Sequence, residues 1–386
     1  MSIRILGIES SCDETAAAVV ADGREVLSSI VASQVEIHRK YGGVVPELAS
    51  REHLRRIVPV VREALGVAGM GLDDLDAIGA TRGPGLIGAL LVGFTYAQAL
   101  AMALRKPLVA VNHLEGHVHA VFLEAYRQGL SPALPAICLI VSGGHTVIYG
   151  VAAAKGNGQR DQGVSKDIAA AVPEGVRLEY TRIGASRDDA AGEAYDKVAR
   201  MLALGYPGGP VIDLLAPGGN PEALRFTTPN IRGNPLDFSF SGIKSAVLRH
   251  IRQHSEMESE IAARQEALDA GRRKVEDLRP LVSSATLDLL ASFQRSVVTD
   301  LVTRTLAAAD DRFAASVMVS GGVAANRELR DTFEREGKKR GLDVFFPSRA
   351  LCTDNAAMIA AAAYPRLLDG EVASGGIDAT ANLPLA

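Results

Sequence analysis

The chain has 386 residues, of which 47% are hydrophobic and 22% charged, and its formal net charge is −4. This length exceeds what one hydrophobic core usually serves, so two lobes are expected, and the ordinary composition excludes disordered and fibrous classes. An acidic chain is no polycation, so nucleic acid could bind only to a local basic patch or through a partner. The three cysteines, Cys12, Cys138 and Cys352, argue against a disulfide framework and favour a reducing, cytoplasmic compartment.

The N-terminal third predicts strands that alternate with long helices. Apolar runs predict strands over 3–8, 16–20, 76–80 and 107–111. Asp22-Gly23 is a hairpin signal, and apolar residues at helical spacing predict a helix over 47–65. An Ala-rich helix ending at Leu104 is too short and too polar for a membrane span, so it is interpreted as a buried core helix. No signal peptide is visible, and no membrane association is expected.

The rest of the chain continues the α/β pattern with two irregular segments. Strands are expected over 136–141 and 316–319, and helices over 188–204 and from 352 to 363. Residues 151–187 are polar and weakly periodic, which predicts an excursion from the sheet. Residues 249–279 have balanced charge, which predicts a solvated helical protrusion without a catalytic role.

Two Ser-Gly-Gly turns each follow an apolar strand, Ser142-Gly143-Gly144 in the first case and Ser320-Gly321-Gly322 in the second. Glycine lets the backbone approach a ligand closely, and successive N–H groups can converge on an anion such as phosphate. The pair suggests two strand ends that face one ligand, although plain turns have the same sequence. Asn326, at the helix start after the second turn, either binds a nucleotide or caps that helix.

The segment from His113 to His117 places two imidazoles four residues apart, on one face of a helix, where both can ligate one metal ion. The alternative is a pair of polar helix histidines. A metalloprotease needs its glutamate directly after the first histidine, whereas Glu115 comes one position later and is rotated off that line by about 100°. Two histidines are an incomplete ligand set, which a carboxylate such as Asp354 would complete, although spacing alone does not select it.

Acidic residues beside turns are further candidates. Asp13 and Glu14 follow the first predicted strand, where carboxylates commonly hold a metal–phosphate or position a nucleophile, and a solvated turn is the alternative. Asp196 lies in the helix expected over 188–204, and Asp213 follows a glycine-rich segment that contains Gly209. Taken alone, Asp196 is typical of a surface helix.

A basic segment over 38–56 is the candidate nucleic-acid surface of this acidic chain. Its cationic and imidazole side chains are His38, Arg39, Lys40, Arg51, Arg55 and Arg56. They either follow an RNA backbone or form a solvated helix face.

Taken together in chain order, the sequence motifs resemble one family, the universal tRNA adenosine threonylcarbamoyltransferases, which were once labelled sialoglycoprotein endopeptidases. The matching segments span almost the whole chain, and the form YGGVVPELASR resembles the bacterial branch. They are IESSCDET (8–15), YGGVVPELASREH (41–53), GPGLIGALLVG (83–93), HLEGH (113–117), VSGGHT (141–146), DDAAGEAYDK (188–197), YPGGP (206–210), FSFSGIKSA (238–246), SGGVAANREL (320–329) and CTDNAAMIA (352–360).

The resemblance implies an α/β, two-lobed actin-like ATPase fold with a ligand cleft between the lobes. The first lobe is expected to comprise 1–112 plus about 352–386, and the second 113–351, with insertions near 151–187 and 249–279. The implied reaction transfers a threonylcarbamoyl group from threonylcarbamoyl-adenylate to N6 of the adenosine 3′-adjacent to the anticodon, in tRNAs that read ANN codons. AMP is released, and a metal assists the acyl transfer.

The resemblance also implies site residues, a cofactor and partners. By motif, His113, His117 and Asp354 match the ligands of one divalent metal per subunit, with iron(II) the usual assignment and zinc the alternative. The substrate-binding positions are matched by Ile140, Val141, Ser142, Gly143, Gly144, Asp196, Gly209, Asp213 and Asn326. Asp13 or Glu14 is expected to be catalytic, by positioning the amine or accepting a proton. Expected partners are tRNA, threonylcarbamoyl-adenylate, a paralogue of the same fold and a small P-loop ATPase.

Two other classes of function compete with the transferase. A metallopeptidase needs a base beside the metal, and the position of Glu115 argues against it. A non-catalytic ATP-binding module of the same fold has no need of imidazole ligands, so an intact set of His113, His117 and Asp354 argues against that class.

Overall fold

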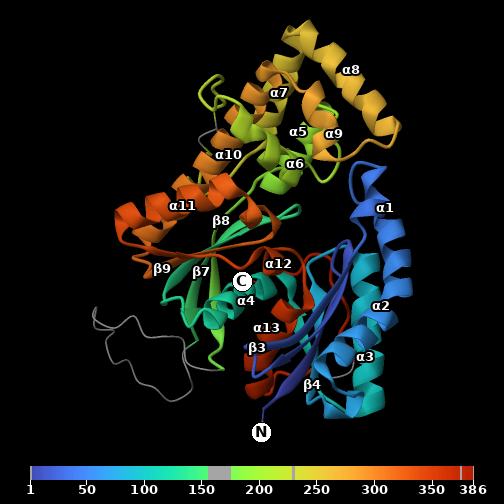
Figure 1. Cartoon of the computed structure of the whole chain (residues 1–386). Helices are drawn as coiled ribbons and strands as arrows, with labels where there is room; N and C mark the ends of the chain where they lie inside the picture. Colours follow the sequence, from blue (N-terminus) through green and yellow to red (C-terminus); the bar gives the residue numbers. More distant parts are fainter. Residues whose placement is uncertain (1, 155–174, 228–230, 374–375, 386) are drawn as a thin grey trace.

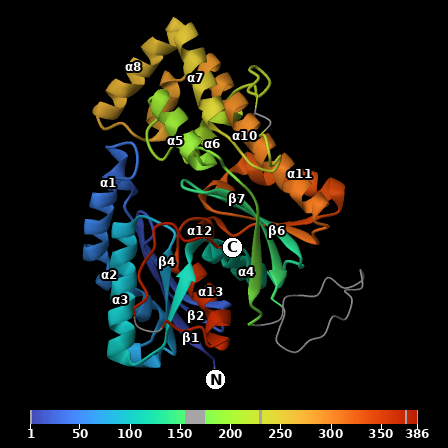
Figure 2. The same cartoon turned by 180° about the vertical axis from the view of Figure 1, so that it is seen from behind.

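The computed structural model describes residues 2–154, 175–227, 231–373 and 376–385, and two five-stranded sheets organise them (Figures 1 and 2). The first sheet has the order β3-β2-β1-β4-β5, with β1 at Arg4–Glu9, β2 at Glu14–Ala21, β3 at Glu25–Ser33, β4 at Ala77–Gly83 and β5 at Leu108–Asn112. The second has the order β10-β9-β6-β7-β8, with β6 at Ala136–Val141, β7 at Thr146–Ala153, β8 at Leu178–Ala185, β9 at Ser316–Ser320 and β10 at Asp343–Phe345.

The two sheets have the same topology. In each, three consecutive strands pair antiparallel, β1-β2-β3 in the first and β6-β7-β8 in the second. The strand that opens each meander also pairs in parallel with the next strand, β1 with β4 and β6 with β9. That strand in turn pairs in parallel with the last one, β4 with β5 and β9 with β10. The prediction of a two-lobed α/β protein is therefore confirmed.

Helices cover both faces of the first sheet over β1, β2 and β4, which explains why these strands are mainly apolar, whereas the edge strand β3 has one exposed side. Leu6 and Ile8 pack on one face against α2 (Pro46–Ala68) and α3 (Ile87–Leu104), while Ile5 faces α13 (Ala356–Leu368). Side chains of a strand alternate between faces, so both sets are buried only when both faces are covered.

The second sheet is covered in the same way. One face packs against helices of its own lobe, and the other packs against α4 (His113–Arg127) through Leu114, Val118 and Val121. Ala120 and Leu123 of α4 belong to the core of the first sheet and α13, so this helix lies between the two sheets. The remaining helices of the described residues are α1 (Val35–Arg39), α5 (Ala191–Met201), α6 (Gly208–Leu215), α7 (Ser241–Gln253), α8 (Ser255–Asp269), α9 (Val275–Leu278), α10 (Ser284–Asp311), α11 (Arg327–Arg340) and α12 (Arg349–Cys352), and short 3-10 turns occur among them.

Two expectations for the irregular segments need correction. The predicted excursion over 151–187 contains the end of β7 and all of β8, while its residues 155–174 lie outside the described residues. The predicted protrusion over 249–279 does form α8, which lies at the periphery of the second lobe (Figure 1). It is not wholly solvated, however, because the Arg264 side chain is buried and its Nε donates to the Leu202 carbonyl at 2.7 Å. The lobe boundaries themselves stay a prediction.

The apolar helix α3 is the one helix of the described chain whose length and composition would suit a membrane span. A third of it is buried, along the face that includes Leu90, Phe94 and Ala97. That face packs against α2 and β4, as expected for a core helix, while Leu91 and Met102 on the other side are exposed.

Candidate metal and ligand site

A cavity of about 1140 Å³ opens between the two lobes, and its lining comes from turns at the ends of strands in both sheets. From the first sheet come the turn between β1 and β2, the residues after β4, and His113 after β5. From the second come the turn between β6 and β7, the residues after β9, and Asp354 after α12. The loop before α2 (41–45), residues of α5 and α6, and Ala381 and Asn382 of the C-terminal tail also line the cavity.

The candidate metal ligands converge at this cavity. Asp354 Oδ1 lies 3.6 Å from His113 Nε2 and 3.3 Å from His117 Nε2. The two imidazole rings meet edge to face with centroids 4.8 Å apart, because one helical turn of α4 separates them. Asp354 lies in the turn just before Asn355, which caps α13, rather than in the helix itself.

A buried carboxylate orients the first imidazole. Glu9, at the end of β1, places Oε2 3.1 Å from His113 Nδ1, and it accepts hydrogen bonds from Thr81 Oγ1 at 2.6 Å and from the Ser11 backbone N–H. A proton on Nδ1 that bonds to Glu9 leaves Nε2 free to face Asp354. A metal-ligating imidazole usually bonds to a carboxylate through its other ring nitrogen, as His113 does here to Glu9.

The electrostatics of the His113, His117 and Asp354 group favour the binding of a cation. Burial acts to lower the pKa of His113, but Asp354 and Glu9 outweigh it and raise the pKa to about 9. Burial alone would raise the pKa of Asp354, and the two imidazoles instead hold it well below its usual range. Burial lowers the pKa of His117, which keeps this ring neutral, as a metal ligand must be.

The residues fit a divalent metal. His117 is fully buried, and neither of its ring nitrogens has a hydrogen-bond partner among the described residues, although Nε2 lies near Asp354. A buried imidazole without partners is costly unless something else binds it. His113, His117 and Asp354 offer one ligand atom each, all within 4.8 Å of one another, the two-histidine, one-carboxylate set that suits iron or zinc.

The glycine turn after β6 lies beside the metal group. The His145 ring, directly after Gly144, has its centroid 6.4 Å from that of His113. Side chains built on Gly143 or Gly144 would meet nothing within 4 Å, so the open space next to this backbone belongs to the cavity. A ligand can therefore reach its N–H groups closely.

The second glycine turn has a structural role as well. Gly321 has a φ of 95°, and a Cβ there would lie 2.4 Å from the Val141 carbonyl oxygen. Because β9 pairs in parallel with β6, the two turns lie side by side, as the sequence echo suggested, and Gly322 lines the same cavity.

Other predicted substrate-binding residues lie around the same cavity. Gly209 and Asp213 are on α6, and Asp196 on α5 accepts a hydrogen bond from the Gly208 N–H at 2.7 Å. Asp213 pairs with Arg327 at 3.1 Å. Asn326 caps α11 through Leu329 N–H at 2.9 Å and donates to Gln294, so its side chain is already engaged.

Ile140 and Val141 differ from the rest of the predicted set. Both side chains are fully buried in the cores of the second lobe, and neither lines the cavity. Their contribution to a ligand could come only from the backbone that leads into Ser142.

Asp13 and Glu14 line the first-lobe side of the cavity. Burial, together with the nearby carboxylates of Asp13 and Asp354, raises the pKa of Glu14 well above its usual range. Glu14 also accepts a hydrogen bond from Ser33 Oγ at 3.2 Å, which ties it to β3.

The glutamate between the two histidines faces away from the metal group. Glu115 accepts a hydrogen bond from Arg366 of α13 at 2.9 Å and is buried, so it fastens α4 to the last helix. This agrees with the prediction, made from its position in the helix, that Glu115 is not a hydrolytic base.

Comparison with known proteins assigns the family. The sequence profile described as TsaD, tRNA N6-adenosine threonylcarbamoyltransferase, matches residues 25–172 and 172–361. The chain belongs to this family. It is 54% identical over 396 residues to the tRNA N6-adenosine threonylcarbamoyltransferase of Koribacter versatilis, covering 99% of this chain and 98% of that one. It is 50% identical over 385 residues to that of Clostridium botulinum strain 657, covering 100% and 98%.

The family membership confirms that the chain is a transferase of the bacterial type that the motifs indicated. Among solved structures, full-length HypF in the phosphate- and nucleotide-bound form is similar with a TM-score of 0.51 at 12% identity, covering 95% of this chain and 47% of that one. That likeness concerns the fold alone, and it agrees with the predicted two-lobed actin-like ATPase fold.

Proposed function

We propose that this protein transfers a threonylcarbamoyl group from threonylcarbamoyl-adenylate to N6 of the adenosine 3′-adjacent to the anticodon, in tRNAs that read ANN codons. The observation that carries the proposal is the position of the His113, His117 and Asp354 group beside an open glycine turn in one cavity. The names of the relatives, which are 54% and 50% identical, support the same acceptor and the same acyl group.

The reaction is an acyl transfer from a mixed anhydride. The N6 amine forms a bond to the carbamoyl carbon, the bond from that carbon to the phosphate oxygen of AMP breaks, and AMP leaves with the electron pair. The amine nitrogen loses one proton. A divalent metal held by His113, His117 and Asp354, iron(II) by the resemblance, would supply Lewis acidity when bound.

The residues of the chain provide charge stabilisation and positioning. The N–H groups of Gly143 and Gly144 are fixed dipoles that can face the departing phosphate, where negative charge collects, whereas the Ser142 N–H already donates to the His145 carbonyl. Asp196, Gly209, Asp213 and Asn326 line the side of the cavity that we assign to the adenylate. Asp13 or Glu14, on the first-lobe side, positions the amine or accepts its proton.

We place the protein in the cytoplasm, where it meets its tRNA, and assign it a protein partner, a paralogue of the same fold. An exposed apolar stripe supports this partner, since Leu54 and Val58 of α2 and Ile87 and Leu91 of α3 are 66%, 37%, 48% and 46% exposed. Spacing of four residues puts each pair on one helix face. Leu54→Glu should abolish co-purification with the paralogue. Retained co-purification would show that these exposed residues are not the contact site. A small P-loop ATPase is the further expected partner.

The test of the proposed function is a transfer assay. Purified, metal-loaded protein with its partner is mixed with threonylcarbamoyl-adenylate and unmodified tRNA, and the nucleosides are analysed by mass spectrometry. We expect N6-threonylcarbamoyladenosine at the position 3′ of the anticodon, with one AMP released per modified nucleoside. Consumption of the adenylate without a modified nucleoside would contradict the proposal.

A further inference from the structure

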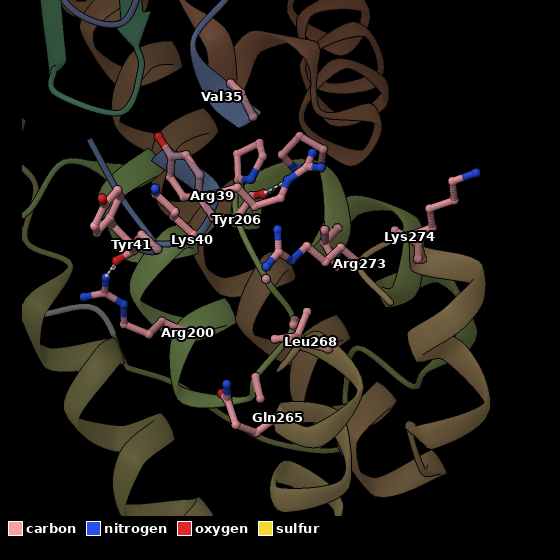
Figure 3. Close-up of a pocket in the computed structure, with 18 of the residues that line it drawn as sticks. Val35, Arg39, Lys40, Tyr41, Arg200, Tyr206, Gln265, Leu268, Arg273 and Lys274 are labelled. Atoms are coloured by element: carbon pink, nitrogen blue, oxygen red, sulfur yellow. Dashed lines mark hydrogen bonds between the residues drawn. The ribbon is translucent and has the colours of Figure 1, made fainter. Parts of the chain in front are cut away.

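A second pocket, of about 610 Å³, opens beside the site cavity (Figure 3). It lies between α1 and the 41–42 loop of the first lobe and the ends of α5 and α8 in the second. Tyr41, Gly42, Arg200 and Tyr206 line both spaces. A group held in this pocket would therefore be the immediate neighbour of whatever occupies the site cavity.

Hydrogen bonds across the lobes shape this shared wall. Arg200 Nη2, from α5, donates to the carbonyl oxygens of Tyr41 and Gly42 at 2.6 and 2.8 Å. Arg39 Nε, from α1, donates to the Tyr206 carbonyl at 3.0 Å. The pocket is thus a built feature of the interface between the lobes, and each lobe contributes an arginine to its wall.

The lining of the pocket is basic in an otherwise acidic chain. Its cations are Arg39, Lys40, Arg200, Arg273 and Lys274, and its carboxylates are Asp269 and Glu276. Arg39 also pairs with Glu36 at 2.6 Å. In the described part of the chain, neither Lys40 nor Arg273 has a carboxylate within ion-pair distance, so both charges are available to an anion.

The unpaired cations are placed to receive a ligand. Figure 3 shows Arg273 extending from the loop after α8 into the middle of the pocket, near Tyr206, whereas Lys274 points outward. Lys40 comes from the α1 side, with Nζ 4.9 Å from the centroid of the Tyr41 ring. Tyr41 is 46% exposed, so its ring offers a stacking surface at the boundary of the two spaces.

We propose that this basic pocket binds a phosphodiester group of the tRNA, one or two nucleotides from the adenosine that enters the site cavity. The inference rests on the proposed function. A base that enters a deep cavity brings its flanking backbone over the rim, and a groove with unpaired cations beside an aromatic ring is how proteins hold single-stranded RNA. An acidic protein segment would also pair with the cations, but its binding would not explain why the pocket is continuous with the site cavity.

The test compares two charge-matched double variants of the full chain, assembled with its partner. The pocket variant is Lys40→Ala with Arg273→Ala. The control is Arg312→Ala with Lys338→Ala, two exposed cations of the second lobe that have no carboxylate within ion-pair distance in the described chain. The ion pair between Arg340 and Asp310 places both beside the end of α11, across the molecule from α1 (Figure 1).

Binding of tRNA is measured over a salt series, and binding of AMP serves as the small-ligand readout. The pocket variant should lower the salt slope by about two units, one for each lost phosphate contact. Its tRNA affinity should fall by about twentyfold at physiological ionic strength. The control variant and the AMP affinity of both variants should match the wild type, and Arg273→Lys should retain most of the slope.

The outcomes separate this proposal from the proposed function. Equal salt slopes in the pocket variant and the control would overturn the proposal, and so would a pocket variant that loses only free nucleotide or only a protein partner. A wild-type protein that binds tRNA but forms no modified nucleoside would instead contradict the transferase, while the slopes still decide the pocket. Unchanged thermal unfolding in the pocket variant shows that loss of binding is not loss of fold.

Discussion

The two sheets share one topology but contribute different chemistry to the cavity between them. In the first, the turn between the opening pair of strands reads Ser10-Ser11-Cys12-Asp13, and in the second the same turn reads Ser142-Gly143-Gly144-His145. The first brings carboxylates and the second brings open backbone. The repeated topology thus places carboxylates on one wall of the cavity and open backbone N–H groups on the other, where both can face one substrate.

The metal ligands show the same correspondence. His113 directly follows β5, the last strand of the first sheet, and Asp354 follows β10, the last strand of the second, after the short α12. The candidate metal group therefore forms where the ends of two equivalent sheets meet. Its integrity requires both lobes, and substitutions on either side can test that dependence.

The largest effect on transfer is expected at His117, the candidate metal ligand whose ring nitrogens have no hydrogen-bond partner among the described residues. His117→Ala should lower threonylcarbamoyl transfer by more than about 100-fold, because loss of a ligand costs more than loss of an outer partner. The control is His119→Ala, which removes another buried imidazole of α4 that lies outside the ligand group. Equal activity in the two variants would mean that transfer does not depend on His117 as a metal ligand.

A stability effect is expected on the second-lobe side. Burial raises the pKa of Asp196 to about 6. Above that pH the folded protein must hold an ionised carboxylate in a buried place, which costs free energy that the unfolded chain does not lose. Asp196→Asn keeps an acceptor for the Gly208 N–H and should raise the free energy of unfolding by about 2–3 kcal/mol at pH 7 to 8. The gain should shrink as the pH falls below about 6 and vanish below about pH 3, where both states are protonated.

Denaturant unfolding at several pH values measures this gain, and the transfer assay runs in parallel. A more stable variant with lower transfer would mark Asp196 as a residue kept for function. A pH-independent change in stability would show that the charge of Asp196 is not the cause.

The two glycine turns should respond differently to the same substitution. Gly144→Val adds a side chain in open space and should weaken AMP binding by about tenfold or more, with little loss of stability. Gly321→Val forces a branched side chain onto a φ of 95° and against the Val141 carbonyl, so it should destabilise the fold itself. Calorimetric binding and thermal unfolding separate the two effects, and unchanged AMP affinity in Gly144→Val would remove this turn from the site.

The smallest effect is expected on the basic face of α2. Arg55 and Arg56 pair with Glu52 at 3.3 and 2.6 Å, so their charges are partly neutralised. Arg51→Ala with Arg55→Ala should therefore lower the salt slope of tRNA binding by about one unit or less. A larger change here than in the Lys40 and Arg273 variant would move the RNA path onto α2.

Sequence reasoning identified the parts of the fold with strong local signals. The apolar strands around Ile5, Ile78 and Ile137 and the helices beside them lie where they were predicted. β3 and β8 were missed because each has one exposed side and carries Ser, Glu or Arg among its apolar residues, so neither forms an apolar run.

The site was predictable where spacing or motif carried it, and not where tertiary contact decides. The histidine pair follows from helical periodicity, whereas Asp354 came only from the resemblance, because the chain brings it back from another lobe. Glu9, Ser11 and Thr81 were missed as the support of His113. A glutamate that ends an apolar strand was the available signal for Glu9, since a buried carboxylate needs partners.

The central claim is that one metal group is assembled from equivalent positions of both lobes, and metal content per chain tests it most directly. Elemental analysis of wild type, His117→Ala and Asp354→Ala should find about one divalent metal per wild-type chain and a large loss in both variants, with thermal unfolding showing each variant folded. A folded Asp354→Ala protein that retains the full wild-type metal content would contradict the claim.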